Sequence, residues 1–118
     1  MFCDGNYLNL QNYGRIVKYN KLVRDKISEI IKQEGKTPII RIADEEEYVL
    51  KLREKLHEEA DEFAESHEVE ELVDIMEVIY ALAEQKGISY EELEKIRQRK
   101  ANKKGRFAKR IILEEVDE

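Results

Sequence analysis

Carboxylate side chains gather in residues 56–80, where the sequence reads LHEEADEFAESHEVEELVDIMEVIY. The stretch contains two predicted helical runs joined by a very short link. Residues three or four apart are neighbours on a helix, and like charges so placed repel by about 0.2–0.5 kcal/mol per pair. Two antiparallel helices that bring such acids together would add repulsion across their interface, and a cation between them would turn it into attraction. The pattern therefore suggests a divalent-metal site between two helices.

Magnesium suits such a site, because it takes oxygen ligands in octahedral geometry and keeps waters and substrate phosphates in its shell. Acids at positions i and i+3 on each of two facing helices supply several oxygens. The candidate ligands are Glu59, Glu62, Glu71 and Asp74. The alternative is a solvated acidic face, which is the usual place for carboxylates. At about 100° per residue, Asp74 lies nearer Glu70 and Glu77 than the Leu72–Met76 stripe, so spacing alone leaves both interpretations open.

Composition favours one helical domain. The chain has 118 residues, of which 41% are charged and 8% aromatic, with a single Pro and no Trp. This mixture is typical of helices rather than of a β-sandwich, and the length is sufficient for a single core. The net charge of -6 argues against general nucleic-acid binding.

The chain also lacks the signals of membrane or secreted proteins. No apolar run approaches the 18 residues of a membrane span, and the N-terminus has no basic region followed by an apolar one. The single cysteine, Cys3, cannot form an internal disulfide. A cytoplasmic location is therefore expected.

Helix start and stop signals divide the chain. Residues 1–18 lack a sustained period and form a predicted N-terminal extension, whereas residues 19–118 form a predicted single helical domain. Asn20 is the expected cap of the first helix, and capping boxes begin at Asp44 and Ser89. Gly35, Gly87 and Gly105 are expected to end the first, third and fourth helices. The four predicted helices cover about residues 21–34, 45–65, 69–86 and 89–102.

Apolar spacing predicts which faces are buried. The core face of the second helix is expected to contain Val49, Leu52, Leu56, Ala60 and Phe63, with Glu59 at its edge. The third helix is apolar round more than half its circumference, which predicts burial on more than one side, most simply against another subunit. The β-branched segments 37–42 and 106–116 are expected to pair as a minor β element.

Three segments together resemble one family. Glu58-Glu59-Ala60-Asp61-Glu62 followed by Glu71-Leu72-Val73-Asp74 resembles the EExxE…ExxD signature of the MazG-like, all-α nucleoside triphosphate pyrophosphohydrolase superfamily. YNKLVRDKISEII (residues 19–31) and KKGRFAKRIILEEV (residues 103–116) resemble the start and the basic tail of its phosphoribosyl-ATP pyrophosphohydrolase-like branch. The resemblance covers about residues 19–116. It implies an all-α, four-helix bundle-like MazG-type domain that forms a homodimer or homotetramer.

The resemblance also implies roles for individual residues. Glu59, Glu62, Glu71 and Asp74 would bind Mg²⁺, or Mn²⁺ in its place, and Glu58 would be a second catalytic acid beside Glu59. An activated water would attack the α-phosphorus of a nucleoside triphosphate, leaving a monophosphate and pyrophosphate. The expected role is house-cleaning hydrolysis of non-standard nucleotides.

Basic residues near both ends of the domain are candidates for substrate binding. Lys21 and Arg24 lie at the start of the first predicted helix, where backbone N–H groups favour anions and basic side chains oppose the helix dipole. Lys104 and Arg106 flank Gly105, which suggests a phosphate-contacting turn, and Asn102 could contact base or sugar. The alternative is surface charge that balances an acidic protein.

The sequence leaves other functions open. A phosphoribosyl-ATP pyrophosphohydrolase of histidine synthesis would use the same scaffold, and a non-catalytic helical interaction module would leave the acids solvated. Glu54 and His57 form an ExxH pair of the kind found in di-iron bundles, but such bundles need two copies, and Ala64 stands three residues before His67. No HExxH motif and no GxxxxGK[ST] loop is present.

Overall fold

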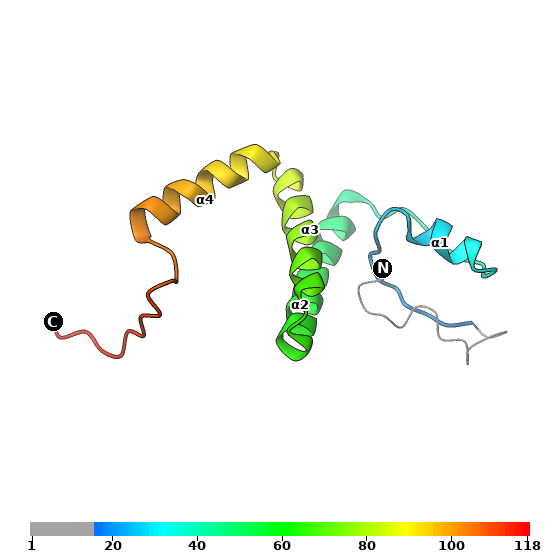
Figure 1. Ribbon diagram of the computed structural model, residues 1–118. Helices are drawn as coiled ribbons and strands as arrows, with labels where there is room; N and C mark the ends of the chain where they lie inside the picture. Colours follow the sequence, from blue (N-terminus) through cyan, green and yellow to red (C-terminus); the bar gives the residue numbers. More distant parts are fainter. Residues whose placement is uncertain (1–15) are drawn as a thin grey trace.

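The computed structural model describes residues 16–118 as four helices with irregular connections. The helices are α1 (Ile27–Gln33), α2 (Glu45–Ser66), α3 (Val69–Gln85) and α4 (Tyr90–Lys104). Figure 1 shows α2 and α3 as an antiparallel pair, with α1 on one side of the pair and α4 on the other. The all-helical class is confirmed. Of the predicted extension, residues 1–15 lie outside the described residues, and residues 16–18 are irregular.

The predicted β element is wrong for this chain. Residues 16–118 contain no strand, and both 37–42 and 106–116 are irregular. A strand needs a neighbouring strand for its backbone hydrogen bonds. The segment before α2 and the segment after α4 lie on opposite sides of the α2–α3 pair, so they cannot supply that partner to each other (Figure 1).

The predicted caps of α2 and α4 are confirmed. The Asp44 carboxylate accepts a hydrogen bond from the Glu47 backbone N–H at 2.8 Å, and the Ser89 hydroxyl accepts one from the Glu92 N–H at 3.1 Å. Each bond satisfies one of the N–H groups that a helix start leaves without an intrahelical partner. The Glu47 side chain also accepts two hydrogen bonds from the Arg41 guanidinium, at 2.5 and 2.7 Å.

The first helix is shorter than predicted. It begins after Lys26 instead of at residue 21, and Asn20 adopts a left-handed backbone conformation with φ 50° rather than capping the helix. The reason is tertiary, because the residues before α1 bind the helix pair. Lys51 Nζ donates a hydrogen bond to the Asn20 carbonyl at 3.2 Å, and Lys21 and Arg24 pair with acids of α2 and α3.

The buried core of the described chain is small. Leu52 of α2 and Val78 and Ala83 of α3 are buried, and Ile27 packs in a separate cluster with residues around α1. Ala60, predicted to face the core, is exposed. No helix in residues 16–118 combines the length and apolar content that a membrane crossing requires.

The molecule is much longer than a compact domain. Its Cα radius of gyration is 18.7 Å and its longest dimension is 64 Å, whereas a compact chain of this length has a radius of gyration of about 13–14 Å. The α4 helix causes much of the difference, because it contacts α3 but not α2. Tyr80 and Tyr90, with ring centroids 5.0 Å apart in an edge-to-face arrangement, join α3 to the start of α4.

Loss of the α2 cap is expected to destabilise the helix pair. Asp44→Ala removes the acceptor for the Glu47 N–H and should lower the free energy of unfolding by about 0.5–2 kcal/mol. Asp44→Asn retains a capping oxygen and serves as the control. Urea unfolding followed by circular dichroism measures both variants, and equal stability of Asp44→Ala and wild type would contradict the role of the cap.

Candidate metal centre

The link between α2 and α3 brings two acidic pairs opposite each other. His67 ends α2 in a left-handed conformation, φ 59° and ψ 20°, and the Ser66 hydroxyl accepts a hydrogen bond from the Glu68 N–H at 3.2 Å. The chain therefore reverses within two residues. The acids that follow and precede this turn are Glu59, Glu62, Glu71 and Asp74.

Three of the four predicted ligands form one cluster. Glu59, Glu71 and Asp74 each place a carboxylate oxygen so that these atoms all lie within 4.8 Å of one another. This group is the one set of three or more potential ligands found in residues 16–118 that could hold a metal ion. Glu62 joins the same neighbourhood, since its carboxyl interacts with those of Glu59 and Glu71.

Glu59 is the most buried of these side chains. The sequence places it at the edge of the core face, whereas the structure buries it completely, with 0% exposure. Lys55, one turn earlier on α2, is 7% exposed, and its Nζ lies 3.6 Å from Glu59 Oε1 and 3.9 Å from Glu58 Oε1. Charges so buried are tolerated only when a partner offsets the cost of removing them from water.

Lys55 was missed by the sequence reasoning. A Lys four residues before a Glu occurs at many exposed helix positions, so its spacing alone carries no signal. The informative feature is its place beside Glu59, at the edge of the face that contains Leu52. The sequence predicts that face to be buried, but only the structure shows that the burial extends to Lys55.

Two of the predicted substrate-binding residues also reach the acids. Lys21 Nζ lies 3.1 Å from Glu58 Oε1, and Arg24 donates a hydrogen bond to Asp74 at 2.8 Å. Both come from the irregular segment before α1, not from a helix N-terminus as predicted. The acids of α2 and α3 are therefore paired with basic side chains from the segment before α1.

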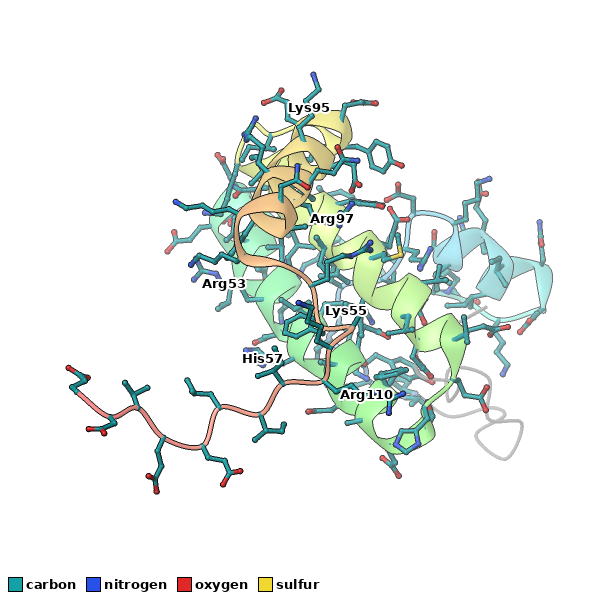
Figure 2. All side chains as sticks on the ribbon, turned by 60° about the vertical axis from the view of Figure 1, so that its left-hand side comes forward. Arg53, Lys55, His57, Lys95, Arg97 and Arg110 are labelled. Atoms are coloured by element: carbon teal, nitrogen blue, oxygen red, sulfur yellow. The ribbon has the colours of Figure 1, made fainter. Side chains whose placement is uncertain are left out.

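The remaining predicted substrate-binding residues lie elsewhere. Asn102 and Lys104 belong to the last turn of α4, and Arg106 follows it. Within one chain α4 begins at the end of α3 opposite the α2–α3 turn and extends away from the pair (Figure 1). Figure 2 shows Lys95 and Arg97 on α4 and Arg110 on the segment after it, whereas Lys55 comes from α2. The structure does not bring these residues to the acids of the same chain.

The histidines do not take part in the acidic cluster. His57 is exposed, and Glu54 of the ExxH pair forms an ion pair with Lys51 at 3.3 Å. His67 lies at the helix turn with its ring centroid 6.3 Å from that of Phe63. These positions do not reproduce a di-iron arrangement.

Crowding of the carboxyl groups changes the protonation of Glu62. Its pKa is raised to about 8, first by burial and then by the negative charges of Glu59 and Glu71, a hydrogen bond with Glu71 and the charge of Glu58. A carboxyl that keeps its proton near neutral pH indicates a site where burial and neighbouring negative charge both disfavour ionisation.

Comparison with protein-family models, with curated proteins and with solved structures gives no match for the chain.

The Glu62 carboxyl predicts an unusual pH dependence of stability. Its pKa is raised from 4.5 to about 8 in the folded protein, so the folded state binds more protons than the unfolded state between these values. The stabilisation is fully present below about pH 4.5 and is lost as the pH rises through about 8. In the presence of a chelator, the Glu62 contribution should lower the melting temperature over this range, and Glu62→Gln should remove that contribution.

Glu65→Gln is the matched control, because Glu65 is exposed on the same helix. Thermal melts at closely spaced pH values measure the three proteins. If Glu62→Gln and wild type show the same pH profile, the proton held by this carboxyl is not linked to folding.

Proposed function

We propose that the protein is a Mg²⁺-dependent nucleoside triphosphate pyrophosphohydrolase of the MazG-like type, with Mn²⁺ as an alternative ion. The carrying observation is the convergence of Glu59, Glu71 and Asp74 oxygens within 4.8 Å across two helices. A solvated acidic face would turn such oxygens outward. Here Glu59 is fully buried and the Asp74 side chain is only 17% exposed.

The charge balance of the cluster supports a cation. Within residues 16–118, the contacts of the cluster join five carboxyl groups with three basic side chains: Glu58, Glu59, Glu62, Glu71 and Asp74 with Lys21, Arg24 and Lys55. Among these described residues, the carboxylates outnumber the cations by one even with the proton on Glu62. A hard divalent ion that prefers carboxylate oxygen fits this donor set.

The four proposed ligands, Glu59, Glu62, Glu71 and Asp74, would hold the ion. When bound, it screens phosphate charge and lowers the pKa of an adjacent water molecule. Glu58, half-buried at the rim of the cluster, would orient the attacking water together with Glu59. Lys21 and Arg24 would contact the triphosphate and hold the α-phosphorus in line for attack, the arrangement on which phosphoryl transfer chiefly depends.

The substrate is a nucleotide, and its base and sugar are left open by this site. Hydrolysis between the α- and β-phosphates would release pyrophosphate and a monophosphate, in the cytoplasm and in a house-cleaning role. A phosphoribosyl-ATP substrate is the alternative with the same chemistry. A panel of canonical and modified nucleoside triphosphates and phosphoribosyl-ATP, scored for released pyrophosphate, distinguishes them.

Substitution of the proposed ligands is expected to abolish turnover without unfolding the protein. Asp74→Asn and Glu59→Gln preserve shape but remove a negative oxygen, and each should lower pyrophosphate release by at least about 100-fold. Asp61→Asn and Glu65→Gln change exposed acids of α2 and should retain wild-type activity. Unchanged turnover by both ligand variants, with folding verified by circular dichroism, would exclude these ligands.

Divalent ions are expected to stabilise the folded protein. Binding to the native state raises the free energy of unfolding by about 2.7 kcal/mol at 100 times the dissociation constant. Mg²⁺ or Mn²⁺ should therefore raise the melting temperature of wild type, and Asp74→Asn should lose this response. NaCl at equal ionic strength controls for screening. A non-catalytic interaction module with solvated acids would melt at the same temperature in both salts.

A further inference from the structure

Positive and negative charge are separated along the chain to an unusual degree. Residues 95–110 contain nine Lys or Arg and no Asp or Glu, whereas residues 54–77 contain eleven Asp or Glu and one Lys. The basic stretch, residues 95–110, is named here the basic arm. It contains the second half of α4 and the first residues after that helix. The acidic stretch contains the candidate metal centre. Opposite charges of this size on separate segments favour contact between them.

The basic arm cannot make this contact within its own chain as folded. From Asp74 to the end of α3 at Gln85 the helix rises by roughly 16 Å, and α4 adds a further length of roughly 22 Å. Because α4 leaves from the far end of α3 and contacts α3 alone, its length increases the separation from the acids. Figure 1 shows this divergence, with the segment after α4 remote from the α2–α3 turn.

Apolar side chains mark where such an arm would dock. One side of α3 faces α2, and the other carries large apolar residues that are 39–72% exposed: Val69, Leu72, Val73, Met76 and Ile79. Their spacing of three and four places them on one helix face. A second exposed apolar set lies on the basic arm and on residues 111–113, which follow it: Ile96, Phe107, Ile111, Ile112 and Leu113. Contiguous exposed apolar surface of this kind marks protein contacts.

We propose that two copies of this chain exchange their basic arms. The arm of one copy packs on the exposed α3 face of the other, and its Lys104 and Arg106 come to the acidic cluster of that second copy. Each chain carries both complementary surfaces, the basic arm and the exposed α3 face. A closed twofold dimer therefore covers the arm and the α3 face of both copies at once. This arrangement also explains a long molecule with few buried residues. The substrate contact of the arm rests on the proposed function, whereas the dimer does not.

The dimer is tested by its mass, which requires no activity. Sedimentation equilibrium of the full chain should give twice 14.0 kDa. Met76→Lys on the α3 face and Phe107→Lys on the arm should each shift the equilibrium to the monomer. Leu50→Lys, at an exposed apolar residue of α2, should remain dimeric. A wild-type monomer, or a dimer that both Met76→Lys and Phe107→Lys leave intact, would overturn arm exchange. Circular dichroism verifies that each variant is helical.

The contribution of the arm to the partner's site is tested by mixing two inactive variants. Asp74→Asn carries intact arms, and the double variant Lys104→Ala/Arg106→Ala carries intact acids. After joint unfolding and refolding, half of the dimers are mixed and each has one complete site, so activity should recover to about a quarter of wild type. Arms that serve their own chain would give no recovery, which would overturn the exchange of function between copies.

The two experiments separate this inference from the proposed function. If Asp74→Asn alone retains full turnover, the assigned ligands are wrong, and the mass measurements still decide whether the arms are exchanged. Binding of nucleic acid by a protein that stays monomeric would instead assign the basic arm to that partner.

Discussion

The burial of the Glu59 carboxylate between α2 and α3 is the interaction on which the rest of the structure depends. A fully buried carboxylate is costly unless countercharge and hydrogen-bonding groups surround it. Lys55 supplies countercharge from the same helix, and Lys21 and Arg24 bring more to the acids beside Glu59. This requirement explains why residues 19–26 bind the helix pair instead of extending α1 towards the N-terminus. The path of residues 19–26 thus depends on ion pairs with the acids of α2 and α3 as well as on the apolar packing of Tyr19 and Val23 against Ile27.

The same acids distinguish a functional site from a solubilising surface. Acidic residues on an ordinary helix surface point to water and repel one another weakly. In this protein the carboxyl groups of two helices converge, and one of them, Glu62, has a pKa raised to about 8 by burial and by its acidic neighbours. Folding therefore holds carboxyl groups close together in a partly buried place, at a cost that apolar side chains at these positions would avoid. Such retained strain is typical of sites that bind a ligand.

Apolar surface presents the complementary problem. The α2–α3 pair buries one side of α3 and leaves the opposite side exposed, and α4 covers little of it. A helix with apolar residues round most of its circumference is stable in water only when both sides are covered. Within one chain, the exposed α3 face lies far from the basic arm and from the apolar residues after α4. A second copy brings them together without any change in the sequence or in the helices.

Local signals in the sequence determined the four helices, because caps, glycines and apolar spacing act over a few residues. Asp44 and Ser89 cap their helices as predicted, and the i,i+3 acids of α2 and α3 meet because the link between them is short. Three features were decided only by the tertiary structure. Residues 21–26 leave the predicted helix because their basic side chains bind distant acids, and Glu59 is buried because Lys55 is buried with it. The predicted β element fails because the two segments lie on opposite sides of the helix pair. In each case the deciding contact joins residues far apart in the chain or on a face whose burial depends on another element, and no local pattern contains that information.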